Sequence, residues 1–322
     1  MLRRLLVVGL LATGGFCLPV AARAATVAIF YYPWYATPSA DSAWQHWNQN
    51  NHRPPGDVYS RYYPASGPYS SSDASTVDRQ LAQIGGAGVD EVIVSWWGRG
   101  SVEDGRLPLV LAVAARHHLA VAIHLEPYDG RTPASVAGDL GYIASLGVRD
   151  VFVYHPRDFT ASEWTALHAG APTLRIFAGS ELPGFAAAGR FDGFYTYDFV
   201  TYGAGKFARL CAQARAARLL CAPSVGPGYD GSRAGEAPIG RGRANGQTYD
   251  VLWSAALHAK PDLVTITSFN EWGEGSQIEP ACRHPGYASY DGAWGMTGSA
   301  AQFAYLTRTA YWAGLAHALP LR

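Results

Sequence analysis

The chain has 322 residues, a length that fits one large α/β barrel or two medium domains. Its 25 lysines and arginines balance its 25 aspartates and glutamates, so no excess of positive charge marks a nucleic-acid-binding surface or a membrane-binding face. Charged residues make up only 16% of the chain, whereas 10 Trp, 19 Tyr and 12 Phe supply many rings of the kind that pack in cores or stack on sugars.

The first two dozen residues have the pattern of a secretory signal peptide. Two arginines precede the mostly apolar run 5–18, and Ala22-Arg23-Ala24 has the small-x-small form of a cleavage site. We expect removal of residues 1–24 and a mature domain over 25–322. No later apolar run is long enough to cross a bilayer. The sequence therefore predicts an exported protein, secreted or periplasmic, with no membrane contact after cleavage.

Three cysteines follow that segment, so the mature chain can form at most one internal disulfide. Cys211 and Cys221 are the candidate pair, and two reduced buried thiols are the equal alternative. The spacing of these residues and Cys282 matches no zinc site.

Stretches of β-forming residues alternate with helical stretches along the whole chain. The predicted strands are residues 26–32, 89–97, 119–125, 150–154, 173–178, 191–197, 219–225 and 263–268. The predicted helices are residues 72–85, 107–118, 133–146, 161–168, 205–218, 249–260 and 300–317. Eight strands in this alternation predict an α/β fold, a single (β/α)8 TIM barrel.

Aromatic, histidine and carboxylate residues gather just after the predicted strands, while the segments that lead into the strands show no such concentration. In a parallel barrel the ends of all strands meet on one face. This asymmetry predicts an active site at the C-terminal face of the strands.

The segment 268–279, directly after the last predicted strand, carries the strongest chemical signal. It places Glu271 and Glu274 three residues apart with Trp272 between them. Paired carboxylates beside an aromatic residue at a barrel strand's end are typical of glycosidases, in which one serves as acid and the other as base or nucleophile. The plain alternative is a solvated turn. We expect Glu279, the third acid of this loop, to turn towards a structural partner.

His124 and Glu126 alternate along a predicted strand and therefore point the same way. Either they form a pair that binds sugar hydroxyls, or they are a satisfied core pair. A metal site would need further ligands at suitable spacing, and the sequence does not supply them. We expect no metal and no cofactor.

Two other clusters have open interpretations. Arg243 lies in the loop before the helix 249–260. Three interpretations are open: it binds a substrate hydroxyl, it orients a catalytic carboxylate, or it is a surface charge. Trp44, His46 and Trp47 either form the floor of a sugar subsite or plug the barrel mouth.

Nine short motifs together identify a family far more specifically than any one of them does alone. They are FYYPWY (30–35), HW (46–47), YSSSD (69–73), SWWG (95–98), HLEPY (124–128), FDGFYTYD (191–198), PSVGPGYD (223–230), RANGQTYD (243–250) and TSFNEWGEGSQIE (267–279). In sequence and order the chain resembles the endo-α-mannosidase family of glycoside hydrolases, family 99.

The resemblance implies a barrel that cleaves internal α-mannosidic bonds with retention and without a metal. It implies that one carboxylate takes the proton of the sugar 2-hydroxyl, whose oxygen displaces the leaving group to form a 1,2-anhydro sugar. Matched by motif, Glu271 is this base and Glu274 is the general acid and then base. The residues that we expect to contact substrate are Tyr35, His46, Trp97, His124, Glu126, Tyr128, Tyr229, Arg243, Asn270 and Trp272.

The chain departs from the family's pattern in three places. Gly273 stands where the family commonly has His, His155 stands where an acid is usual, and the segment between the third and sixth strands is short. With tryptophan at position 97, the chain resembles the bacterial branch of the family, which acts on mannose-containing chains.

We therefore expect a monomeric, exported, endo-acting α-mannosidase whose partner is α-mannan or a mannose-containing glycan. The alternatives are a carbohydrate-binding barrel with altered catalysis, a glycoside hydrolase for another α-linked substrate, and a metal-dependent barrel hydrolase.

Overall fold

Parallel strands form the centre of the molecule. The structure is a computed structural model that describes residues 24–180, 182–235 and 240–319. The strands of its main sheet are β1 Thr26–Tyr31, β3 Glu91–Trp96, β4 Ala120–Leu125, β5 Asp150–Val153, β6 Arg175–Gly179, β7 Gly193–Tyr195, β8 Leu220–Ala222, β9 Ser224–Val225 and β10 Leu263–Ile266. The predicted signal peptide lies, except for Ala24, outside the described residues.

The sheet closes on itself. Its order is β8-β7-β6-β5-β4-β3-β1-β10-β9, with parallel pairing throughout. The first and last members, β8 and β9, are two parts of one strand interrupted at Pro223, which has no N–H to donate. The Pro223 carbonyl still accepts from the Thr265 N–H at 3.1 Å. The two edges of the sheet are thus one strand, which makes a closed eight-stranded barrel.

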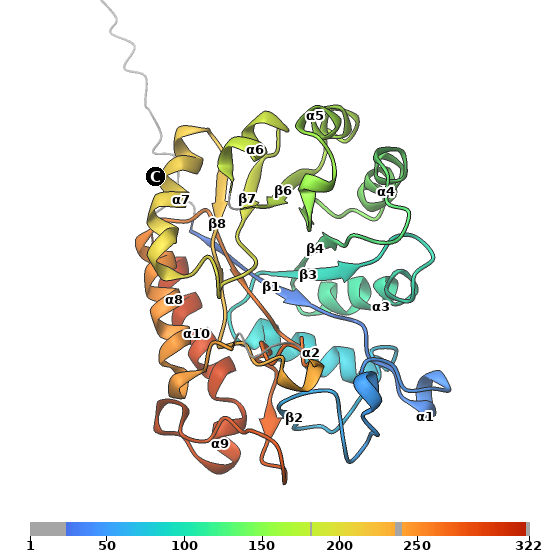
Figure 1. Cartoon of the computed structure of the whole chain (residues 1–322), viewed down its shortest axis with the longest axis vertical. Coiled ribbons are helices and arrows are strands. Elements are labelled where there is room, and N and C mark those ends of the chain that lie inside the picture. The colour runs from blue at the N-terminus through green and yellow to red at the C-terminus, as the bar shows by residue number, and fades with distance from the viewer. Residues whose placement is uncertain (1–23, 181, 236–239, 320–322) are drawn as a thin grey trace, which may run out of the picture.

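Helices surround this barrel (Figure 1). They are α2 Ala74–Gly86, α3 Val102–Arg116, α4 Pro133–Ser145, α5 Ala161–Gly170, α6 Pro183–Ala188, α7 Ala204–Ala216, α8 Gln247–His258 and α10 Ala304–Ala318. Smaller elements are α1 Pro38–Asp41, α9 Gly298–Gln302, the antiparallel pair β2 Tyr63–Pro64 and β11 Ala281–Cys282, and 3-10 turns at Gln49–Asn51, Pro156–Asp158, Ser232–Ala234, Ala244–Gly246 and Ala293–Gly295. The predicted (β/α)8 architecture is confirmed.

Three helix predictions need correction. Helix α3 begins at Val102 and not at residue 107, because the Ser101 hydroxyl accepts from the Asp104 N–H and caps the helix start. Helix α6 was not predicted, and its six residues are too few to show a helical period. The closing helix is divided at Phe303 into α9 and α10.

Aspartates at the start of the barrel help to set strand register. Asp90 accepts from the Val27 N–H at 2.8 Å, Asp192 from the Ile176 N–H at 2.7 Å and Asp262 from the Cys221 N–H at 2.8 Å. Each of these aspartates directly precedes one strand. Its carboxylate accepts from a backbone N–H near the start of another strand, so it satisfies a donor at the end of the sheet.

Aromatic side chains fill the barrel interior. Residues that alternate along a strand point to the same side, and here they bring Phe30, Phe152, Phe177 and Tyr195 into one buried cluster. The Phe152 and Phe177 rings stack with centroids 4.7 Å apart. This packing leaves the barrel solid below its C-terminal face, so a site has to form at the mouth. Within the described ranges, no helix combines the length and apolar character that a membrane span needs.

Cys211 of α7 and Cys221 of β8 form a disulfide across 5.3 Å between their Cα atoms. The alternative prediction, two reduced thiols, is therefore wrong. Cys282 is a free, half-buried thiol.

Breaking this disulfide should destabilise the protein. A bridge between residues ten positions apart restricts the unfolded chain, so Cys211→Ala should lower the free energy of unfolding by about 2–3 kcal/mol. Thermal melts of the oxidised protein and the variant measure this loss. Cys282→Ala is the matched control and should keep the wild-type melting temperature to within a few degrees. An equal loss in both variants would contradict a stabilising bridge.

Candidate active site

The loop that leaves β10 folds back on itself over the barrel mouth. The Ser268 N–H donates to the Ser276 carbonyl at 2.9 Å, and the Ile278 N–H donates to the Ser268 carbonyl at 2.9 Å. The Phe269 N–H donates to the Phe30 carbonyl of β1, also at 2.9 Å. These backbone bonds make a closed loop whose tip, residues 271–274, carries both predicted catalytic glutamates.

A cleft of about 250 Å³ lies beneath this tip. Its walls come from segments that follow β1, β3, β4, β5, β7 and β10, together with two loops. The side chains that line it are Tyr32, Trp34, Tyr35, His46, Gln49, Tyr59, Trp97, His124, Glu126, Pro127, Tyr154, Tyr197, Ala234, Glu271, Gly273 and Glu274. Three carboxyl groups therefore face one aromatic cleft at the C-terminal ends of the strands.

Glu271 is almost fully buried in this cleft. Its Oε1 accepts from the Gly273 N–H at 3.1 Å, while its buried Oε2 has no hydrogen-bond partner among the described residues. Burial, then the negative charge of Glu274, raise the pKa of Glu271 well above the ordinary value for glutamate. The carboxyl is thus a strong base with one oxygen left for a ligand.

Glycine at position 273 has a local steric cause. A Cβ atom there would lie 2.6 Å from the Tyr59 ring and 3.1 Å from Glu271 Oε1. Tyr59 lines the cleft and fills the space that a side chain at 273 would need. With Tyr59 in this position, a side chain larger than that of glycine does not fit at position 273.

Glu274 is held from its backbone and its side chain. Its carbonyl accepts from the Asp230 N–H at 2.8 Å, and the Ser276 hydroxyl lies 3.4 Å from its Oε2. Gly275 follows with φ +63°, a left-handed conformation that glycine adopts at no steric cost. This turn sends Glu274 back towards Glu271 and the cleft.

His124 and Glu126 meet in the cleft as their alternation predicts. The Nδ1 atom of His124 lies 2.9 Å from Glu126 Oε1, although off the direction of a hydrogen bond, and its Nε2 lies 2.8 Å from the Tyr195 hydroxyl. Ser95 donates to the same Glu126 oxygen at 2.8 Å and accepts from the Trp34 indole N–H at 3.1 Å. Glu126 is therefore oriented from two sides, while both residues still line the cleft.

Aromatic rings form the wall at one end of the cleft. The Trp34 ring stacks on His46 with centroids 4.8 Å apart and lies 6.4 Å from Trp97. Trp97 is 37% exposed, so a face of its ring is open to a ligand. Burial, then the charge of Arg106, lower the pKa of His46 to about 4. A neutral imidazole therefore stacks in this wall at neutral pH.

Tyr35 lines the cleft and also fixes the catalytic loop. Its hydroxyl donates to the Asn270 carbonyl at 2.8 Å and accepts from the Trp272 N–H at 3.1 Å. The tyrosine thus bridges the segment after β1 to the backbone on both sides of Glu271.

Asn270 and Trp272 lie under the loop and not in the lining of the cleft. The Asn270 amide exchanges hydrogen bonds with the backbone of Tyr32, at 2.8 and 3.0 Å. The Trp272 indole donates to Glu279 at 2.9 Å, and Tyr69 donates to the same carboxylate at 2.7 Å. The expectation that Glu279 turns to structural partners is confirmed, and burial raises its pKa to about 7.

Arg243 is likewise placed beneath the loop. Its guanidinium lies 4.5, 4.7 and 4.6 Å from the ring centroids of Tyr62, Tyr290 and Tyr305. Its Nη2 donates to the Gly275 carbonyl at 2.9 Å and to the Gln277 carbonyl at 2.6 Å. Of the interpretations left open, surface charge is wrong, and the observed contacts hold the backbone that carries Glu274.

Two further residues expected at the substrate lie outside the lining of the cleft. The Tyr128 hydroxyl donates to Asp139 and lies 2.7 Å from Ser135 Oγ, so it secures the start of α4. The backbone of Tyr229 pairs with Arg241 in an antiparallel bridge. We therefore find Tyr35, His46, Trp97, His124, Glu126, Glu271 and Glu274 together at the cleft, and Tyr128, Tyr229, Arg243, Asn270 and Trp272 around it.

Sequence reasoning did not select Tyr32, Trp34, Tyr154 and Tyr197, which all line the cleft. Each follows the end of a strand by one to three residues, a signal that was present in the sequence. In the described part of the chain, no cluster of three or more His, Cys, Asp or Glu residues has the arrangement of a metal site.

A closed (β/α)8 barrel with carboxyl groups and exposed aromatic rings at its C-terminal mouth has the architecture of a glycoside hydrolase. The chain belongs to glycosyl hydrolase family 99, whose sequence profile matches residues 23–159 and 175–316. The protein is thus a glycoside hydrolase of the endo-α-mannosidase type. The unmatched residues 160–174 contain α5.

Known proteins agree with this assignment. The chain is 34% identical to a glycoprotein endo-alpha-1,2-mannosidase-like protein of Danio rerio, over 79% of this chain and 70% of that protein. It is 33% identical to a glycoprotein endo-alpha-1,2-mannosidase of Xenopus laevis, over 79% and 69%. The family 99 endo-alpha-mannosidase structure from Bacteroides thetaiotaomicron is 29% identical and superposes with a TM-score of 0.79, over 90% of this chain and 97% of that one.

Removing the guanidinium of Arg243 should displace Glu274. Arg243→Met deletes two hydrogen bonds from a charged donor, so the free energy of unfolding should fall by about 3 kcal/mol. A shift of the loop should also lower kcat on the order of 10- to 100-fold. Chemical denaturation and steady-state kinetics measure the two effects. Arg209→Met on the surface of α7 is the control, and wild-type kcat in a folded Arg243→Met would contradict this role.

Proposed function

We propose that this protein is an exported, retaining, endo-acting α-mannosidase that cleaves internal bonds of mannan or a mannose-containing glycan. The observation that carries the proposal is the carboxyl group of Glu271, buried beside Glu274 with Oε2 left unpartnered at the cleft. A buried acceptor without a partner is costly, and a sugar hydroxyl would satisfy it. Names of the related endo-α-mannosidases support mannose as the sugar.

The first step uses both glutamates. Glu271 takes the proton of the 2-hydroxyl, and the O2 oxygen attacks C1 of the same sugar. The bond from C1 to the leaving oxygen breaks, while Glu274 gives its proton to that oxygen. The product is a 1,2-anhydro sugar, with Glu271 protonated and Glu274 ionised. The raised pKa of Glu271 makes it a strong base for this proton transfer.

The second step reverses the proton movements. Ionised Glu274 takes a proton from water, whose oxygen attacks C1 and breaks the bond from C1 to O2. Glu271 returns its proton to O2, which restores the 2-hydroxyl and both starting protonation states. Each step inverts C1, so the product retains the original configuration.

The remaining cleft residues suit a neutral sugar. Trp34, His46 and Trp97 offer aromatic faces, and Glu126, oriented by Ser95, offers acceptors for hydroxyl groups. The neutral state of His46 keeps positive charge away from the reacting carbon. For export, the proposal rests on the signal-peptide pattern of residues 1–24.

The two glutamates should differ in their response to a good leaving group. Both Glu271→Gln and Glu274→Gln should lose on the order of 100-fold or more in kcat on a natural α-mannoside. On a glycosyl fluoride, whose leaving group needs no proton, Glu274→Gln should keep most of its kcat/KM, which reports the first step, whereas Glu271→Gln should not. Steady-state kinetics on both substrates decide this. Rescue of Glu271→Gln in place of Glu274→Gln would reverse the two roles.

The pH dependence should report Glu271. The base acts only when ionised, so kcat/KM should fall as pH drops through its raised pKa, at a higher pH than an ordinary glutamate would give. On a glycosyl fluoride, Glu274→Gln keeps an uncharged side chain beside Glu271, as protonated Glu274 does in the reacting enzyme, so this acidic limb should stay in place. Glu163→Gln, a surface change on α5, is the control. An acidic limb in the pH range of an ordinary glutamate would show that another group controls it.

A further inference from the structure

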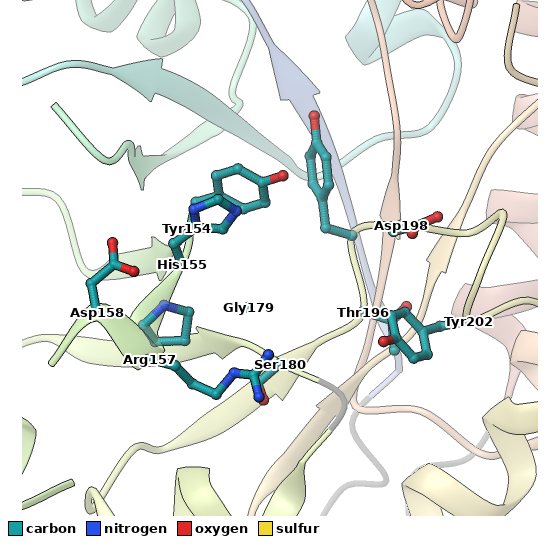
Figure 2. A pocket seen from close by; sticks show the side chains of 11 residues that line it. Tyr154, His155, Arg157, Asp158, Gly179, Ser180, Thr196, Asp198 and Tyr202 are labelled. Carbon is teal, nitrogen blue, oxygen red and sulfur yellow. The ribbon is translucent and has the colours of Figure 1, made fainter. Parts of the chain in front are cut away.

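A second cavity of about 360 Å³ opens on the same face of the barrel, at the ends of β5, β6 and β7. Figure 2 shows its rim, with Tyr154 and His155 at one side, Thr196 and Tyr202 opposite, and Arg157 and Ser180 along the lower edge. Gly179 lies at the centre and has no side chain to fill the space. The functional assignment above uses none of these residues except Tyr154.

This cavity adjoins the catalytic cleft, because Tyr154 and Tyr197 line both. The two rings lie 5.2 Å apart. Tyr197 is held by its hydroxyl, which lies 2.7 Å from that of Tyr32, and by the His124 ring stacked on it at 5.4 Å. The rings of Tyr154 and Tyr197 thus form an aromatic partition that borders both spaces.

The partition presents an aromatic surface to the second cavity. His155 is exposed and stacks on Tyr154, with centroids 4.2 Å apart and planes inclined by 25°. Tyr202 lies on the opposite side of the cavity (Figure 2). Rings on two sides of a narrow space suit the apolar faces of a sugar.

Hydrogen-bonding groups at the rim are free to bind a ligand. Arg131 binds Asp158 at 2.6 Å and neutralises it, whereas Arg157 makes no hydrogen bond or ion pair to any described residue. The hydroxyl oxygens of Ser180 and Thr196 accept from backbone N–H groups, so each keeps its own hydrogen to donate.

An acceptor completes the set. The Oδ1 atom of Asp198 accepts from the Val200 and Thr201 N–H groups, each at 2.9 Å, which fixes the carboxylate. The cavity therefore offers hydrogen-bond donors together with a carboxylate acceptor. Sugar hydroxyls, which both donate and accept, match this mixture, while an anionic group would meet Asp198.

Glycine at position 179 is required by the neighbouring strands. A Cβ atom at this position would lie 2.7 Å from the Val153 carbonyl and 2.8 Å from the Tyr195 hydroxyl. The strands approach closely here, so a larger residue at position 179 would push them apart.

We propose that this second cavity binds a further neutral sugar unit of the same glycan whose bond is cleaved at Glu271 and Glu274. The inference rests on the proposed α-mannosidase function for the identity of the glycan. Arg157, Ser180 and the Tyr154–His155 pair would then contact a sugar unit other than the reacting one, and so recognise the length of the glycan.

The test compares substrates of different length. For wild type, kcat/KM on an α-mannotetraose-type oligosaccharide should exceed that on the disaccharide by at least tenfold. Arg157→Ala should reduce this ratio about tenfold, the effect of losing one or two charge-assisted hydrogen bonds. Arg209→Ala, an exposed arginine on the outer surface of α7, is the matched control and should keep the wild-type ratio.

A binding measurement separates this inference from the catalytic proposal. Calorimetry on the Glu271→Gln protein should show the unreacted tetrasaccharide binding about tenfold more weakly when Arg157→Ala is added. A protein that cleaves no α-mannoside overturns the proposed function, whereas cleavage with a length ratio unaffected by Arg157→Ala overturns the second subsite alone. Tighter binding of a phosphorylated mannoside, lost in Arg157→Ala, would identify an anion site and overturn the neutral-sugar assignment.

Discussion

Two carboxyl groups that repel each other must be kept together in a largely desolvated cleft, and much of the surrounding structure serves this constraint. Glu271 and Glu274 lie on a loop of a few residues, so the loop itself has to resist their separation. Backbone pairing between residues 268 and 276–278 closes the loop, and the Phe269 N–H attaches it to β1. Arg243 then holds two of its carbonyl groups from below.

The support beneath the loop is mostly neutral or aromatic. The Arg243 guanidinium is surrounded by three tyrosine rings, whose faces attract a cation without bringing a carboxylate near Glu274. A carboxylate partner for this arginine would add negative charge to a region that already has three acids. Tyr35 fixes the loop through a neutral hydroxyl. The arrangement thus positions the glutamates, while burial and then the charge of Glu274 raise the pKa of Glu271.

The solid interior of the barrel has a matching role. Phe30, in the buried cluster, lies 4.8 Å from His124 and 5.0 Å from Tyr197, so the core extends directly into the floor of the cleft. Close packing restricts the positions that these side chains can take. The partition of Tyr154 and Tyr197, with His124 stacked on Tyr197, borders both the cleft and the second cavity. One set of rings therefore shapes both spaces.

The sequence by itself determined the barrel, because runs of β-forming residues alternate with helical runs along the whole chain. It also identified the glutamate pair and the face that carries it, since residues at strand ends must meet there. Only the tertiary structure decided which neighbours reach the cleft. Arg243 and Trp272 turn beneath the loop, Tyr59 fills the space above Gly273, and Tyr197 stands between two cavities. These positions depend on contacts between segments far apart in the chain, and no local pattern encodes such contacts.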